Sequence, residues 1–290
     1  TAEAKCIIRE FEPDVAVGTG GYVCFPVLKA ASELGVPTAV HESNAVPGLT
    51  TKMLEGAVDT IMVGFEESRA NYRHPDRVEV TGTPVRVDFL DQDKAAARRE
   101  LGIPEGKPLV VSVWGSLGAS HMNEIMTDFI VRACAKPFFN LIHSAGKAGY
   151  SRMKDALERE KPDYARLGMD VRDYIYDMPR VMAAADLVLC RAGASTLAEL
   201  TAMGKPAILV PSPNVTNNHQ ERNARVLEEA GGAKVMLEQD FTADSLLGLV
   251  SELLQRPERL KEMSQNMLGL GVPDATDRIA DIVLGLAERK

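Results

Sequence analysis

The sequence predicts an α/β fold in which parallel strands alternate with helices over two domains. A short apolar stretch is followed by a glycine-containing turn and then by a helical stretch, and this unit recurs along the chain. The stretch from Pro108 to Val113 is an apolar run of the kind found in strands that are buried on both faces of a parallel sheet. The length of 290 residues suits two domains. Strands that alternate with helices in this way predict parallel sheets covered by helices.

The first part of the chain is predicted to hold four short strands, each leading into a turn or a helix. These strands are residues 14–17, 38–40, 60–63 and 78–80. A helix is expected up to Leu34, where Gly35 ends it, and a second helix from Leu49 to Glu55. The domain boundary is predicted around residues 86–91, after the turn that follows the fourth strand.

The second part of the chain is predicted to open with a helix that Asp93 caps and Gly102 ends. Its predicted strands are residues 108–113, 139–143, 168–172, 186–190, 207–210 and 234–237. Its most evident helices are residues 195–203, 220–230 and 243–254. In a sheet of this kind, the glycine turns at the carboxyl ends of the strands are where ligands bind.

The composition excludes several classes of protein. The chain carries 33 basic and 41 acidic residues, a net charge of −8, so a general nucleic-acid-binding role is not expected. No apolar stretch approaches the roughly 18 residues that a membrane-spanning helix needs. The four cysteines (Cys6, Cys24, Cys134 and Cys190) show neither a CxxC pair nor a metal-ligand spacing. They are interpreted as reduced core residues of a cytoplasmic protein, and no metal or cofactor is expected.

Two glycine-rich turns follow predicted strands and precede helices. They are residues 18–22 (GTGGY) and 115–119 (GSLGA). Glycine lets the backbone approach a phosphate closely, and the free N–H groups of a helix start favour an anion. A tight turn between a strand and a helix explains the same pattern, so either turn alone leaves both interpretations open.

Three polar segments are further candidates for a site. Glu199 follows the small-residue turn 191–196, where its carboxylate can accept hydrogen bonds from a ribose diol or simply complement the helix dipole. Residues 217–223 (NNHQERN) form a hydrogen-bonding run at a helix start, and residues 41–44 (HESN) directly follow a strand. Residues 217–223 could instead be a solvated loop, and the histidine of residues 41–44 could be structural.

Taken together, these segments resemble the MurG family, the peripheral-membrane N-acetylglucosaminyltransferases of peptidoglycan synthesis (glycosyltransferase family 28). The resemblance extends in order over almost the whole chain. The matching segments are PDVAVGTGGYV (13–23), HESNAVPGLT (41–50), VTGTPVR (80–86), GSLGASHMNE (115–124), ADLVLCRAGASTLAEL (185–200), NNHQERNA (217–224) and PDAT (273–276).

The resemblance implies a GT-B fold, with two Rossmann-like domains facing each other across a cleft. It places an acceptor-side domain at residues 1–88, a UDP-GlcNAc-binding domain at 89–270, and a helix that returns to the first domain at 271–290. The implied reaction transfers GlcNAc from UDP-GlcNAc to the MurNAc 4-hydroxyl of lipid I, with inversion, at the cytoplasmic face of the bacterial membrane. Backbone N–H groups can stabilise the departing UDP without a metal.

The resemblance also assigns roles to single residues. Ile175 contacts the uracil through its backbone, Glu199 takes the ribose hydroxyls, and Ser116 helps to hold the diphosphate. The implied UDP-GlcNAc-binding residues are Arg86, Gly115, Ser116, Gly118, Ile175, Arg191, Gly193, Ser195, Thr196, Glu199, His219 and Gln220. The implied acceptor-side residues are Gly20, Gly21, Tyr22, Asn44 and Asn123.

The chain departs from the family pattern at two places. The phosphate loop commonly reads GGSQGA, whereas Trp114 and Leu117 stand here for a glycine and the glutamine. The family's first glycine loop, GGTGGH, would lie upstream of residue 1, and its histidine is the usual candidate base. We therefore expect an incomplete N-terminal domain with little transferase activity, in which His41 and Glu42 only assist. The alternatives are a UDP-sugar 2-epimerase of the same fold, or a non-catalytic chain that binds UDP-sugar.

Overall fold

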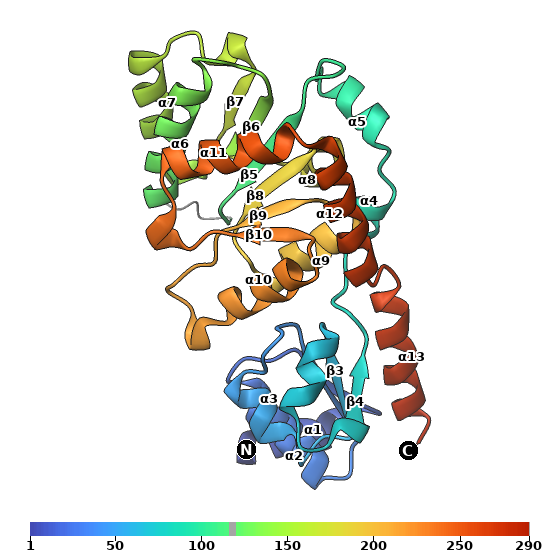
Figure 1. The fold of residues 1–290 in the computed structure, drawn as a ribbon. Helices are drawn as coiled ribbons and strands as arrows, with labels where there is room; N and C mark the ends of the chain where they lie inside the picture. The colour runs from blue at the N-terminus through green and yellow to red at the C-terminus, as the bar shows by residue number, and fades with distance from the viewer. Residues whose placement is uncertain (116–119, 290) are drawn as a thin grey trace.

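The computed structural model describes residues 1–115 and 120–289, and these form two α/β domains, each built on a parallel sheet (Figure 1). The N-terminal sheet has the strand order β1-β2-β3-β4, and the C-terminal sheet has the order β10-β9-β8-β5-β6-β7. Every strand pair in both sheets is parallel. The α/β class and the two-domain GT-B architecture predicted from the sequence are confirmed.

The N-terminal sheet is small and covered by short helices. Its strands are β1 (Ala16–Gly18), β2 (Thr38–Glu42), β3 (Thr60–Val63) and β4 (Val78–Val80). Its helices are α1 (Ala2–Phe11), α2 (Cys24–Glu33), α3 (Leu49–Leu54) and the 3-10 helices η1 (Glu66–Asn71) and η2 (Pro75–Arg77). All five residues of β2 are buried, because this strand lies inside the sheet with neighbours on both sides.

The C-terminal sheet is larger and has helices on both faces. Its strands are β5 (Leu109–Val113), β6 (Asn140–Ser144), β7 (Met169–Arg172), β8 (Leu187–Cys190), β9 (Ala207–Leu209) and β10 (Ala233–Val235). One face packs against α6 (Ser120–Ala133), α7 (Lys147–Glu160) and α11 (Ala243–Leu254). The other packs against α5 (Lys94–Glu100), α8 (Met178–Ala184), α9 (Ala194–Ala202) and α10 (His219–Glu229). Three short 3-10 helices complete it: η3 (Ala165–Leu167), η4 (Thr216–Asn218) and η5 (Glu238–Asp240).

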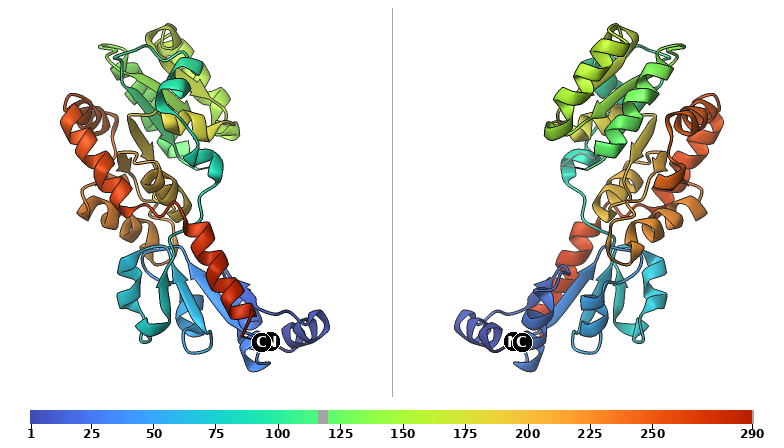
Figure 2. Two further views of the ribbon diagram at one scale, coloured as in Figure 1. Left: turned by 90° about the vertical axis from the view of Figure 1, so that its right-hand side faces the viewer. Right: turned by 90° about the vertical axis from the view of Figure 1, so that its left-hand side faces the viewer.

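Two segments connect the domains. The first runs from β4 into α4 (Val87–Leu90), whose Phe89 is already part of the C-terminal core. The second leaves α12 (Pro257–Leu270) and enters α13 (Ala275–Ala287), which lies along the N-terminal sheet (Figure 2). There Leu286 packs against Ala39 of β2 and Met62 of β3. The last helix therefore completes the core of the first domain.

Most sequence-predicted strands and helices are confirmed within two residues of their predicted ends. Asp93 caps α5 as predicted, because its carboxylate accepts a hydrogen bond of 2.7 Å from the Ala96 N–H. Helices α1, α7 and α12 were not anticipated. The prediction that all four cysteines lie in the core is wrong for Cys6, which is exposed on α1, whereas the other three are buried.

The strand order of the C-terminal sheet determines where its binding crevice lies. From β5 the chain proceeds outward through β6 and β7, and then crosses back to β8 and continues outward through β9 and β10. The order therefore reverses between β5 and β8. Ligands of open α/β sheets bind beyond the carboxyl ends of the strands at such a reversal.

Candidate functional site

A cavity of about 490 Å³ opens at the reversal point of the C-terminal sheet. The end of β5 contributes Trp114 and Gly115, and the end of β8 contributes Cys190 and Arg191. The complete lining is Val113, Trp114, Gly115, Ser144, Tyr174, Ile175, Met178, Met182, Cys190, Arg191, Gly193, Thr196, Glu199, Ser212 and Gln220. The structure thus brings together predicted site residues from segments that are far apart in the sequence.

Glu199 supplies the carboxylate of this cavity. It lies in the second turn of α9, a helix that begins directly after the turn at Gly193. Burial raises the pKa of Glu199 to about 6, and Arg86 from the interdomain segment opposes that rise. The carboxylate is therefore ionised at neutral pH. Because it is partly desolvated, a hydrogen bond donated by a ligand would stabilise it.

Arg191 supports the wall of the cavity rather than standing free within it. Its guanidinium donates to the carbonyl oxygens of Val210 and Pro211 at 3.1 and 3.2 Å, and it pairs with Glu238 at 2.7 Å. It also lies over the indole ring of Trp114, 5.9 Å from the ring centroid. These contacts join the end of β8 to the end of β9, so Arg191 stabilises the shape of the site.

Trp114 replaces the expected glycine and forms part of the same wall. The ring is buried and packs edge-to-face on Phe241, with the centroids 5.4 Å apart. Its Nε1 is buried with no hydrogen-bond partner among the described residues. Packing against Phe241 and Arg191 therefore holds Trp114 in place directly before Gly115.

Other predicted donor-side residues lie at the edge of the cavity or outside the described residues. Gln220 lines the cavity, and its Oε1 accepts a 2.9 Å hydrogen bond from the Ser212 N–H. His219 is half-buried and engaged with the Thr216 carbonyl at 2.9 Å, whereas Ser195 is exposed, and neither belongs to the lining. Arg86 is exposed and pairs with Asp88 at 2.7 Å. The predicted contacts of Ser116, Leu117 and Gly118 lie outside the described residues.

Asn123, which the resemblance assigns to the acceptor side, lies in the C-terminal domain. It is buried in α6 of the C-terminal domain, and its Nδ2 donates to the Ala145 carbonyl at 2.7 Å. Its Oδ1 lies 3.3 Å from Nε2 of His143, whose Nδ1 is 3.0 Å from the Ser112 hydroxyl. Burial lowers the pKa of His143 to about 3, so this ring stays neutral. These contacts engage Asn123 within the C-terminal domain, and its acceptor-side role stays a prediction.

The other predicted acceptor-side residues lie at the carboxyl edge of the N-terminal sheet. Gly20 and Gly21 follow β1 with φ values of +88° and +79°, which other residues rarely adopt, and Tyr22 is 88% exposed. In contrast, Glu42 is buried and accepts four hydrogen bonds within its own loop. His41 is buried as well, with its Nε2 2.8 Å from the Gly82 carbonyl.

Sequence reasoning missed several members of the cavity wall. Tyr174, Ser144 and Ser212 line it without having been singled out, and Met178 and Met182 line it as well. Each lies at the end of a strand, shortly after one, or in a helix that follows one. Their position relative to the strand ends is therefore the signal that identifies them.

The described residues show neither a metal-binding cluster nor a membrane-spanning helix. In residues 1–115 and 120–289, no group of three or more His, Cys, Asp or Glu side chains is arranged to hold a metal ion. Within the same ranges, no helix has the length and apolar character required to cross a bilayer.

Comparison with known families places the chain. The C-terminal domain of glycosyltransferase family 28 matches residues 109–279, and the N-terminal domain of the same family matches residues 1–63. The chain belongs to glycosyltransferase family 28. A family-28 relative from Acetivibrio thermocellus is 43% identical over 290 residues, which is 100% of this chain and 77% of the relative. A relative from Bacillus cytotoxicus is 39% identical over 288 residues, covering 99% of this chain and 78% of the relative.

Both relatives carry the name UDP-N-acetylglucosamine–N-acetylmuramyl-(pentapeptide) pyrophosphoryl-undecaprenol N-acetylglucosamine transferase. Among solved structures, MurG of Acinetobacter baumannii matches with a TM-score of 0.79 and 26% identity, over 98% of this chain and 77% of that one. A UDP-N-acetylglucosamine 2-epimerase assigned in Listeria monocytogenes matches at 0.73 with 14% identity, over 100% of this chain and 78% of that one. The latter likeness shows the shared fold alone. This family-28 chain is a glycosyltransferase.

Proposed function

We propose that the cavity at the reversal point binds UDP-GlcNAc, and that the chain transfers its GlcNAc to the MurNAc 4-hydroxyl of lipid I to form lipid II. The reaction is the one named for relatives about 40% identical over nearly the whole chain. The observation that carries the proposal is the half-buried Glu199 carboxylate in a cavity between the carboxyl ends of β5 and β8.

Each wall of the cavity suits one part of the donor. The Glu199 carboxylate accepts hydrogen bonds from the two ribose hydroxyls, which are stronger than neutral ones because the acceptor is charged. Ile175 and Gln220 line the same cavity, and we assign the backbone of Ile175 to the uracil and Gln220 to the sugar. The N-terminus of α9 begins at Gly193 in the same wall, so its unpaired N–H groups favour the diphosphate.

The chemistry follows from where charge develops. In an inverting transfer, the acceptor hydroxyl attacks the anomeric carbon as the bond to UDP breaks, and negative charge builds on the departing diphosphate. Backbone N–H groups fixed before the reaction stabilise that charge at no reorganisation cost. We assign the proton acceptor to neither His41 nor Glu42, because the former is bound to the Gly82 carbonyl and the carboxylate oxygens of the latter already accept four hydrogen bonds.

We also propose that the protein works as a peripheral protein at the cytoplasmic face of the bacterial membrane, in cell-wall synthesis and so in cell shape and division. The acceptor named for its relatives is carried on undecaprenol, a membrane lipid. Large apolar side chains are exposed on the N-terminal domain, namely Ile7, Phe11, Val17, Tyr22, Val23, Val27, Leu49 and Met53. Residues 1–88 carry 8 basic and 13 acidic side chains, so apolar contact rather than attraction to anionic lipid supports this location.

The donor site has a built-in reporter. The chain has one tryptophan, and Trp114 lines the cavity. Titration with UDP should change its fluorescence, and calorimetry should give the same dissociation constant. Glu199→Ala serves as the matched control. The absence of a fluorescence change and of heat at millimolar UDP would contradict the donor site. A transfer assay with a lipid I analogue then separates the transferase from an epimerase, which would convert UDP-GlcNAc without an acceptor.

A further inference from the structure

The polar segment 41–45 reaches the connection between the domains rather than the donor cavity. The described lining of that cavity comes entirely from the C-terminal domain. The side chains of His41, Glu42 and Asn44 instead bind the interdomain segment, their own loop and a helix of the other domain. The hydrogen bonds of these three polar residues thus all lie at the junction between the two domains.

Glu42 determines the shape of the loop between β2 and α3. Its Oε1 accepts from the N–H of Asn44 at 3.1 Å and from the Nδ2 of the same residue at 3.0 Å. Its Oε2 accepts from the Gly48 N–H at 2.9 Å and from the Thr51 hydroxyl at 2.8 Å. A buried carboxylate satisfied by four donors holds both ends of the loop, and so fixes where Asn44 is presented.

Asn223 of α10 receives this loop from the other domain. Its Oδ1 accepts from the Ala45 N–H at 2.9 Å, and its Nδ2 donates to the Asn44 Oδ1 at 3.1 Å. The same Nδ2 lies 3.3 Å from the carbonyl of Ala192, which stands between the cavity-lining residues Arg191 and Gly193. Asn223 is fully buried. One amide therefore touches both the N-terminal loop and the turn of the donor cavity.

His41 binds the first of the two interdomain segments. Its Nε2–H donates to the Gly82 carbonyl at 2.8 Å. Gly82 has a φ of +73°, and a Cβ at this position would lie 2.5 Å from the Cβ of Val272, on the second interdomain segment. The two segments are therefore in close contact at this glycine, which a larger side chain would separate.

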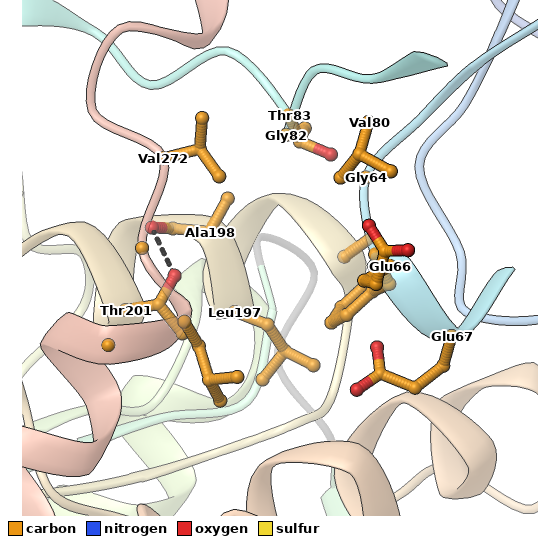
Figure 3. Close-up of a pocket in the computed structure, with 15 residues that line it drawn as sticks. Gly64, Glu66, Glu67, Val80, Gly82, Thr83, Leu197, Ala198, Thr201 and Val272 are labelled. Carbon is orange, nitrogen blue, oxygen red and sulfur yellow. Dashed lines mark hydrogen bonds between the residues drawn. The ribbon is translucent and has the colours of Figure 1, made fainter. Parts of the chain in front are cut away.

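A second cavity, of about 210 Å³, lies at this junction (Figure 3). The N-terminal domain and the interdomain segment contribute Gly64 and Gly82, and the facing side of α9 contributes Leu197 and Thr201. Helix α9 thus carries Glu199 into the donor cavity and borders the interdomain cavity as well. The same helix therefore lies against the domain junction and against the donor cavity.

We propose that His41, Glu42 and Asn44, together with Asn223, form a domain-coupling element whose members are positioning residues. Glu42 presents the loop, Asn223 clamps it to the donor-cavity turn, and His41 holds the adjacent interdomain segment. Occupancy of the donor cavity is transmitted to the acceptor-side loop through the Ala192–Asn223–Asn44 contacts. This transmission rests on the proposed donor site, whereas the clamp itself does not.

Hydrogen exchange of the full chain tests both parts. In Asn223→Ala, the amide of Ala45 loses its acceptor, so its exchange should rise by about tenfold. Saturating UDP should slow exchange over residues 43–51 in the unchanged protein and leave it unaltered in the variant. The control is Asn266→Ala, which removes an asparagine that donates to the Gly231 carbonyl away from the junction; the exchange of residues 43–51 should not change in it.

A second variant keeps the test informative if Asn223→Ala fails to fold. Asn44→Ala removes the Asn223 Nδ2–Asn44 Oδ1 hydrogen bond from the N-terminal side, keeps the Ala45 N–H bond to Asn223, and leaves the C-terminal core intact. Equal exchange of residues 43–51 in the unchanged protein and in the folded variants would overturn the clamp. Slower exchange around residues 190–220 alone, with UDP bound, would overturn the coupling and leave the proposed function standing. No change with UDP anywhere would refute the donor site and the transmission, while the variants would still decide the clamp.

Discussion

Two glutamates near the domain interface, Glu42 and Glu199, show how the same side chain serves two purposes. Glu42 ends β2 of the N-terminal sheet, is 6% exposed, and has four donors from its own loop on its carboxylate. Glu199 lies on a helix beside a cavity, and burial raises its pKa to about 6. A carboxylate whose partners are built into the fold stabilises structure, whereas one that is desolvated beside a cavity is available to a ligand.

The local chain explains why the two differ. The loop after Glu42 turns back at residues 43–48, so its N–H groups point at the carboxylate. Glu199 extends from a regular helix whose own N–H groups are paired along the axis after the first turn. Its acceptor capacity therefore faces the cavity, where a bound diol can use it.

The largest effect should come from Glu42→Ala. The substitution leaves the partly buried N–H groups of Asn44 and Gly48 and the buried Thr51 hydroxyl without their acceptor, so we expect the free energy of unfolding to fall by about 3 kcal/mol. Urea unfolding followed by circular dichroism measures it. A loss below about 1 kcal/mol would show that the loop finds other partners, and the contrast with Glu199 would then fail.

Glu199→Ala should affect binding rather than stability. We expect UDP affinity to fall by about 10- to 100-fold, as for loss of hydrogen bonds to a charged acceptor, and the free energy of unfolding to change by no more than about 0.5 kcal/mol. Calorimetric titration and urea unfolding of the same preparation check the pair of outcomes. If the variant unfolds more easily but binds UDP normally, Glu199 is a structural residue like Glu42.

The pH dependence of UDP binding should sharpen the contrast further. Because the pKa of Glu199 is raised to about 6, its carboxylate is lost as the pH falls through 6, and affinity should drop several-fold between about pH 7 and pH 5. Stability runs the other way: the raised pKa stabilises the fold most below the unfolded value of 4.5, and this gain is lost as the pH rises through 6. Glu199→Gln is the control, since UDP itself titrates equally with both proteins. Parallel profiles for the two proteins would contradict the assignment.

The smallest effect on stability should come from Tyr22→Ala at the N-terminal edge. Tyr22 is 88% exposed, so its removal should alter the free energy of unfolding by less than about 0.5 kcal/mol. If this ring serves the acceptor side, UDP affinity should be unchanged and the KM for a lipid I analogue should rise in a transfer assay. A lower UDP affinity would instead link this edge to the donor site.

Much of the fold was predictable because local patterns determine it. Strand β3 and helix α11 have the predicted ends. A short apolar run marks the strand, and a helical repeat of apolar residues after a capping residue marks the helix; both are local signals. Glu199, Ile175 and Gly193 were likewise predicted as donor-side residues, and they do line one cavity. Helix α7 was missed because only Met153 and Leu157 of its side chains are buried, which leaves little apolar periodicity.

The sequence by itself determined the alternation of strands and helices, the glycine turns at the strand ends and the family. Only the tertiary structure decided which polar side chains are hydrogen-bonded within the protein and which remain available to a ligand. Asn223 and Asn44 are 179 positions apart in the chain. Leu286, near the end of the chain, packs on Ala39, near its beginning. Hydrogen-bond partners of this kind depend on how the two sheets and the last helix are placed. A motif such as HESN therefore specifies donors and acceptors, while the fold determines whether they meet each other or a substrate.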